Sequence, residues 1–69
     1  MREKLDRLID EMLNKGIPYD DARQAIERRL ISLALTRSKG HLTQAADLLG
    51  IHRNTLSRKV AAYGLKRTG

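Results

Sequence analysis

A run of hydrogen-bonding side chains between Gly50 and Gly64 offers the clearest chemistry in the sequence. Arginine donates paired hydrogen bonds to a base edge or a phosphate, and short polar side chains bind base edges or phosphate oxygens. If the apolar Leu56 and Val60 face inward on a helix, most of these polar side chains turn outward or onto its flank. The run consists of Arg53, Asn54, Thr55, Ser57, Arg58 and Lys59. Its polar, positive surface suits an anionic partner.

No set of side chains suited to catalysis or to metal binding accompanies this run. His41 and His52 are eleven residues apart, with no cysteine and no clustered carboxylates nearby, so we do not expect a metal site. A glycine-rich phosphate loop is also absent from the sequence. We therefore expect that the chain is not an enzyme, and we expect no cofactor and no small-molecule substrate.

The net charge of +6 is distributed unevenly along the chain. Residues 1–36 carry seven basic and seven acidic side chains, which cancel. Residues 37–69 carry a single acid, Asp47, against seven basic side chains. These are Arg37, Lys39, Arg53, Arg58, Lys59, Lys66 and Arg67. A local excess of this sign attracts polyanions, whereas a basic segment that is merely solvated would have the same composition.

The length of 69 residues allows one domain at most. A chain this short buries only about 60% of the surface that its unfolded form exposes. Because the chain has no cysteine, neither a disulfide nor a cysteine-bound metal can stabilise it, and we expect self-association. No apolar run approaches the ~20 residues of a membrane-spanning helix, and no signal peptide is visible. We expect a cytoplasmic, nucleoid-associated protein.

Two helices are predicted in the first half of the chain. Apolar residues at three- and four-residue intervals predict a first amphipathic helix that ends near Lys15, where Gly16 can adopt a left-handed conformation. Pro18 marks the start of a second helix, capped by Asp20 or the residue before it, that runs to about Ser38.

The second helix is apolar on nearly every side over residues 30–35. Such a segment must be covered from several directions, and in a chain this small a second copy is the expected cover. We therefore predict a homodimer formed by residues 1–38. The expected interface residues are Leu5, Leu8, Ile9, Met12, Ile26, Leu30, Ile31, Leu33 and Leu35.

The second half has the spacing of a helix-turn-helix over residues 42–65. Thr43 is expected to cap a third helix from about Gln44 to Leu49, with Leu42 just ahead as a hydrophobic staple. Gly50 permits the positive backbone angle of a sharp turn.

A fourth helix is expected from near Arg53 to Tyr63. Ala46 is small where two helices cross, and Ile51, Leu56 and Val60 pin this helix to the core. No strand pattern occurs, so the predicted fold is all-α with four helices.

The sequence also resembles a known family, the Fis-type DNA-binding domain of the nucleoid protein Fis and of bacterial enhancer-binding activators. The resemblance spans roughly residues 26–65. It is carried by the segments Ile31-Ser32-Leu33-Ala34-Leu35-Thr36 with Gly40, Ala45-Ala46, Leu49-Gly50-Ile51, Arg53-Asn54-Thr55-Leu56, and Lys59 with Tyr63-Gly64-Leu65. It implies a four-helix protomer whose first two helices interlock with a partner, so that two helix-turn-helix units enter successive major grooves.

The resemblance also implies which residues contact DNA. Carried over position by position, the family's contacts fall on His41, Thr43, Gln44, His52, Arg53, Thr55, Ser57 and Arg58. Thr43 and Gln44 suit phosphates at a helix amino terminus, and Thr55 suits another phosphate. Arg53 is the expected guanine contact, and Asn54 or Arg58 reads a neighbouring base edge or a phosphate.

The sequence departs from the family pattern at five positions. The family often has asparagine at the positions of His41 and His52, and commonly a basic residue at Ser57. Ala61 and Ala62 stand where Fis itself is basic. These differences give more weight to Arg53 and Arg58.

Two other functions are consistent with some of these features. The chain could be a helical interaction or dimerisation module of a larger regulator, whose binding would not weaken as salt rises. RNA binding is a weaker alternative, because two tyrosines and no other aromatic residues leave little surface for stacking bases. We expect double-stranded DNA and a second copy of the chain as the partners.

Overall fold

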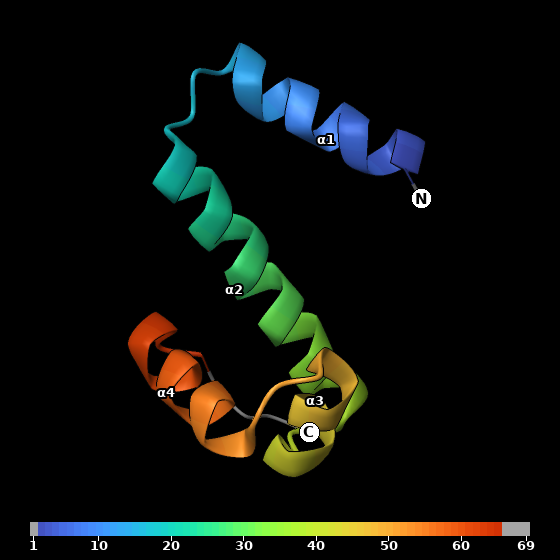
Figure 1. The fold of residues 1–69 in the computed structure, drawn as a ribbon, viewed down its shortest axis with the longest axis vertical. Coiled ribbons are helices and arrows are strands. Elements are labelled where there is room, and N and C mark those ends of the chain that lie inside the picture. Colours follow the sequence, from blue (N-terminus) through green and yellow to red (C-terminus); the bar gives the residue numbers. More distant parts are fainter. Residues whose placement is uncertain (1, 66–69) are drawn as a thin grey trace.

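The computed structural model describes residues 2–65, which form four helices and no strand, as predicted (Figure 1). The helices are α1 (Arg2–Asn14), α2 (Tyr19–Arg37), α3 (Leu42–Leu49) and α4 (Arg53–Tyr63). No helix in this part of the chain is both long and apolar enough to cross a membrane. Lys66 and Arg67, two of the basic residues counted above, lie outside the described residues.

The turn between α3 and α4 has the conformation that its glycine predicts. Gly50 has a φ of +69°, a backbone conformation that costs an L-residue about 1–2 kcal/mol. The amide of Ile51 donates to the carbonyl of Ala46 at 3.1 Å, and the amide of Gly50 donates to the carbonyl of Asp47 at 3.2 Å. The glycine therefore ends α3 and lets the chain turn sharply into α4.

The starts of two helices differ from the sequence predictions. The Thr43 cap is wrong, because α3 already begins at Leu42, whose side chain is buried, and His41 occupies the capping position. At α2 the capping position belongs to Pro18, so neither Asp20 nor the residue before it caps this helix. Asp20 instead lies in the first turn, where a negative charge favours the helix dipole.

The hydrophobic core lies where α2, α3 and α4 pack against one another. Each of the three helices contributes small or branched apolar side chains. The buried residues are Ile31, Ala34 and Leu35 from α2, Leu42, Ala45 and Ala46 from α3, and Leu56 and Val60 from α4. Ala45 and Ala46 are almost completely buried, so larger side chains there would push the helices apart.

The first helix contributes nothing to this core. α1 has no buried residue and stands apart from α3 and α4, to which only α2 connects it (Figure 1). Its apolar stripe is therefore open, with Leu5 44% and Leu8 45% exposed.

The apolar residues of α2 divide into an inner and an outer set. Ile31 and Leu35 are each only 2% exposed and pack into the core of their own chain. Because Ile31 and Leu35 are buried within their own chain, a second copy cannot cover them, and their predicted role in the dimer interface is wrong. Leu30 and Leu33 are 55% and 44% exposed and lie on the outer side of the helix.

Candidate nucleic-acid interface

The helix α4 has one buried side and one polar side. Leu56 is completely buried and Val60 nearly so, and together they fix the rotation of α4 about its own axis. This rotation leaves Arg53, Asn54, Ser57 and Arg58 exposed, as the periodicity predicts. Thr55 is half-buried at the edge of this surface. We call Arg53, Asn54, Ser57 and Arg58 the α4 face.

The amino terminus of α4 is capped by a histidine that sequence reasoning did not identify as a cap. The Nδ1 atom of His52 accepts a hydrogen bond from the backbone amide of Asn54 at 3.0 Å. An imidazole nitrogen that accepts a hydrogen bond carries no proton, so Nε2 is the ring nitrogen left to donate. His52 is exposed, and its Nε2–H is therefore a free donor beside Arg53.

The start of α3 supplies a second set of exposed polar groups. His41 stands at the capping position, and Thr43 and Gln44 lie in the first turn, all three exposed. No side chain caps this end of α3, so backbone amides of its first turn remain free to donate. Such a terminus favours an anion such as phosphate.

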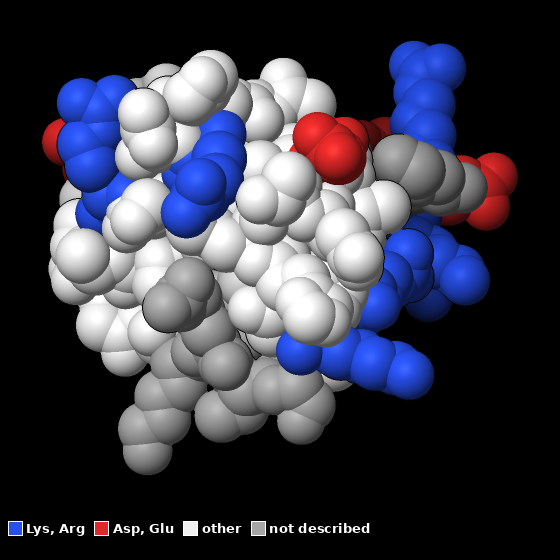
Figure 2. Space-filling view, turned by 90° about the horizontal axis from the view of Figure 1, so that it is seen from below, with Lys and Arg blue, Asp and Glu red and all other residues white. Residues whose placement is uncertain are grey.

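The end of the molecule that carries α3 and α4 is rich in basic side chains. Figure 2 shows this end, where basic side chains and an acidic one are separated by uncharged surface; the basic side chains at the upper right of the view lie over the start of α1. Asp47 is the only acid among the described residues from 37 onward. This surface suits a polyanion better than a cationic or an apolar partner.

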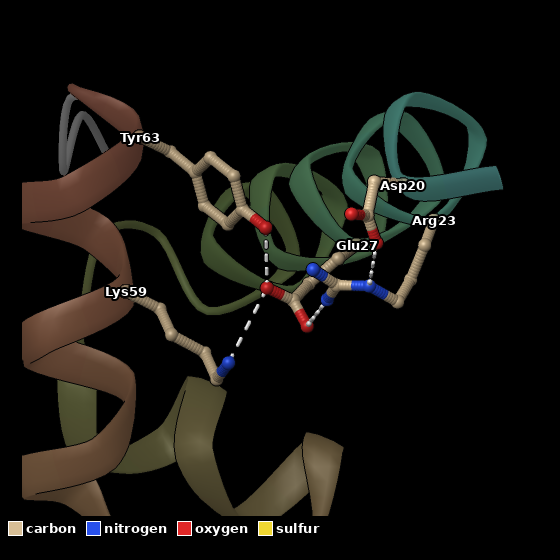
Figure 3. Close-up of polar contacts among 5 residues, drawn as sticks. All are labelled: Asp20, Arg23, Glu27, Lys59 and Tyr63. Atoms are coloured by element: carbon tan, nitrogen blue, oxygen red, sulfur yellow. Dashed lines mark hydrogen bonds and ion pairs between the residues drawn. The ribbon is translucent and has the colours of Figure 1, made fainter. Parts of the chain in front are cut away.

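Lys59 differs from the other cations of α4 because it has a partner within the chain. Its Nζ lies 3.3 Å from Oε1 of Glu27 on α2 (Figure 3). The hydroxyl of Tyr63 donates to the same oxygen at 2.5 Å, and Arg23 lies 3.8 Å from the other carboxylate oxygen. Lys59 was expected to face DNA, whereas the structure points its ammonium toward α2. We call Arg23, Glu27, Lys59 and Tyr63 the Glu27 cluster.

The Glu27 cluster shifts the pKa of two of its members. The hydrogen bond from Tyr63 lowers the pKa of Glu27 below its ordinary value of 4.5, with Lys59 and Arg23 adding to the effect against some desolvation. The same hydrogen bond raises the pKa of Tyr63 above its ordinary value of 10.0, because the phenol must stay protonated to donate it.

These shifts predict how folding stability depends on pH. A carboxyl with a lowered folded pKa contributes stability that is complete above 4.5 and is lost as pH falls through the folded value. A phenol with a raised pKa contributes stability that is complete below 10.0 and is lost as pH rises through the folded value.

We expect the Glu27→Gln variant to show a weaker loss of melting temperature in acid than the native chain. Thermal unfolding followed by circular dichroism measures this, with Glu3→Gln on exposed α1 as control. Equal acid sensitivity in Glu27→Gln and the native chain would contradict the assignment.

Sequence reasoning did not single out Glu27 or its contact with Tyr63. The partners are 32 and 36 residues away along the chain, beyond the reach of helical periodicity. The three- and four-residue spacing of Asp20, Arg23 and Glu27 was visible, and the structure forms ion pairs at both spacings. That spacing indicates a charged face of α2 but gives no sign that α4 packs against it.

Comparison with known proteins bears on residues 22–63, which match the family described as bacterial regulatory protein, Fis family. This match covers the greater part of α2 and all of α3 and α4. No solved structure matches the chain.

Two kinds of relative share this similarity. A putative Fis-like DNA-binding protein of Ralstonia nicotianae is 37% identical over 67 residues, covering 94% of this chain and 87% of that protein. The DNA-binding transcriptional regulator NtrC of Azospirillum brasilense is 45% identical over 51 residues, covering 74% of this chain and 10% of that protein. NtrC of Rhizobium meliloti is 38% identical over 65 residues, covering 94% of this chain and 13% of that protein. The chain thus spans about a tenth of the NtrC relatives and most of the Fis-like one. By its sequence and by the helices that it forms, the chain belongs to the Fis family of bacterial regulatory proteins.

Proposed function

We propose that the chain binds double-stranded DNA with sequence preference, as a homodimer, and acts as a bacterial transcriptional regulator or a nucleoid-type protein. The observation that carries this proposal is the α4 face, where four exposed polar or basic side chains lie opposite a fully buried Leu56. A helix held in this way and exposed on one side fits a major groove.

The residues of the interface have different tasks in this proposal. Arg53, in the first turn of α4, donates two hydrogen bonds to a guanine, and Asn54 or Arg58 reads a neighbouring base edge or a phosphate. Thr43, Gln44 and the free amides at the start of α3 bind phosphates and set the register. His52, Thr55 and Ser57 add hydrogen bonds at the edges of this contact.

The homodimer is supported by the apolar surface that the chain leaves open. Six of the predicted interface residues are exposed, and Met12 is half-buried. The exposed ones are Leu5, Leu8, Ile9, Ile26, Leu30 and Leu33. Of the predicted interface residues, Ile9, Met12 and Ile26 line an open apolar hollow between α1 and α2. A second copy that covers this surface by two-fold symmetry gives two recognition helices and an inverted-repeat site.

The relatives bear on the wider role. The Ralstonia relative is named a Fis-like DNA-binding protein and the NtrC relatives are named transcriptional regulators. In our proposal residues 1–38 dimerise and residues 42–65 bind DNA in the cytoplasm, where a bacterial chromosome lies.

A salt titration tests DNA binding against the alternative of a protein-interaction module. We expect the affinity for a 30-base-pair duplex, measured by fluorescence anisotropy, to fall by about 10³-fold between 50 and 200 mM salt if about six phosphates are contacted. Apolar helix docking would be indifferent to salt or strengthened by it. Absence of duplex binding, or binding that salt leaves unchanged, would contradict the proposal.

A further inference from the structure

Glu27 is the one side chain of α2 that forms hydrogen bonds with α4 among the residues that the structure describes, and the guanidinium of Arg28 lies over the Tyr63 ring, 5.5 Å from its centroid. Tyr63 and Lys59 are one helical turn apart on α4, so both reach the same carboxylate oxygen (Figure 3). Arg23, one turn away from Glu27 on α2, holds the other oxygen at 3.8 Å. Glu27 is 26% exposed and Lys59 38%, so the contact is partly shielded from solvent.

The Glu27 cluster contacts the carboxy-terminal end of α4, where a contact has a large effect on the tilt of the helix. The amino end of α4 is held by the turn at Gly50 and by the His52 cap, whereas Tyr63 is the last residue of the helix. The two ends are about 15 Å apart. Apolar packing of α4 by Leu56, Val60 and the ring of Tyr63 is not directional, so it fixes which side of the helix is buried more firmly than it fixes the tilt. Hydrogen bonds at the far end are directional and fix that tilt.

The cluster also alters the charge that α4 offers to DNA. A lysine ammonium is a point charge that binds any phosphate within reach and carries no sequence information. In this structure the ammonium of Lys59 is paired with Glu27, and Arg23 is shared between Glu27 and Asp20. Pairing lowers the positive charge beside the α4 face without touching Arg53 or Arg58.

We propose that Glu27 is a positioning residue for DNA recognition. Its hydrogen bond with Tyr63 fixes the tilt of α4, and its ion pair with Lys59 keeps that ammonium from binding DNA phosphates. This inference rests on the proposed DNA binding. Glu27 thereby lowers the affinity for DNA of any sequence and increases the discrimination between DNA sequences. In this proposal Lys59 does not contact a phosphate.

Three substitutions separate the two roles of Glu27. Glu27→Gln removes the negative charge that pairs with Lys59, Lys59→Met removes the cation itself, and Tyr63→Phe removes only the hydroxyl that donates to the carboxylate. The matched control is Asp21→Asn, which changes the net charge of the chain as Glu27→Gln does but lies on exposed α2 surface and forms no ion pair among the described residues. Circular dichroism establishes that each variant is folded before it is titrated.

The measurement is the affinity of each full chain for two duplexes of equal length at several salt concentrations. One duplex is recovered by selection from random DNA, and the other is a scrambled version. For Glu27→Gln we expect tighter binding to the scrambled duplex, a salt slope steeper by about one unit per protomer, and about tenfold less discrimination. For Tyr63→Phe we expect the loss of discrimination with no change in slope. For Lys59→Met and Asp21→Asn we expect the native salt slope.

Each contrary result has one meaning. A shallower slope in Lys59→Met would show that Lys59 binds a phosphate and would overturn the inference. Native slope and native discrimination in a folded Glu27→Gln variant would likewise overturn it, leaving the contact purely structural. If the native chain binds neither duplex, the proposed function fails and the inference fails with it. If the native chain binds both duplexes and the variants behave like it, only the inference fails.

Discussion

Arg53→Ala is expected to lower the preference for a selected duplex over a scrambled one by about 10- to 100-fold, the equivalent of one bidentate base contact. Arg53 is exposed in the first turn of α4 and forms no ion pair among the described residues. Its removal should therefore change folding stability by no more than about 0.5 kcal/mol. Gel-shift titration of both duplexes measures the preference, and thermal unfolding measures the stability.

The control for this variant is Arg7→Ala, which removes the same charge from exposed α1. It should lower the affinity for both duplexes slightly and equally, since the remaining effect is long-range electrostatics. If Arg53→Ala discriminates as well as the native chain, Arg53 is not the base contact and α4 is not oriented as proposed.

Leu30→Asp is expected to dissociate the proposed homodimer while leaving the protomer folded. Leu30 is 55% exposed in a single chain, so a carboxylate there stays hydrated in the monomer. In the dimer the same carboxylate would be buried without a partner, at a cost of several kcal/mol. Analytical ultracentrifugation gives the oligomeric state, and circular dichroism gives the helix content.

The neighbouring residue provides the contrast. Ile31 is only 2% exposed and packs between α2 and the other core helices, so Ile31→Asp should unfold the protomer itself. The sequence predicts interface roles for both residues, and burial of Ile31 within its own chain separates them. A Leu30→Asp chain that remains dimeric at native stability would place the interface elsewhere.

Much of the fold could be predicted from local signals in the sequence. Glycine and proline mark four of the helix ends, and the predicted α4, from Arg53 to Tyr63, agrees with the structure at both ends. The exposed and buried sides of α4 also follow from its periodicity. These features depend on residues within about four positions of each other, which is the range over which helical geometry acts.

The remaining features depend on contacts between distant parts of the chain. Residues 30–35 are apolar all round, so periodicity alone could not show which side faces α3 and α4. The start of α3 was misplaced because Thr43 is a good cap in isolation, whereas burial of Leu42 starts the helix earlier. The Glu27 cluster joins α2 to the end of α4, and only the packing of the three helices brings its members together.

The division of the apolar residues also indicates how the proposed function is built. The core belongs to α2, α3 and α4, so the helix-turn-helix can keep its shape without α1. The open stripe of α1 and the outer side of α2 are then available for a second copy. In this arrangement α2 packs against α4 on its inner side and against the second copy on its outer side. The same helix therefore influences both the spacing and the orientation of the two recognition helices.

The central claim is that the α4 face contacts a DNA duplex, and chemical-shift mapping tests it most directly. An isotopically labelled chain is titrated with a duplex recovered by selection, and the backbone amide signals are followed. We predict the largest shifts from Arg53 to Arg58 and at Thr43 and Gln44, with small changes along α1. Shifts confined to α1 or to the outer side of α2, with the signals of α4 unmoved, would contradict the account.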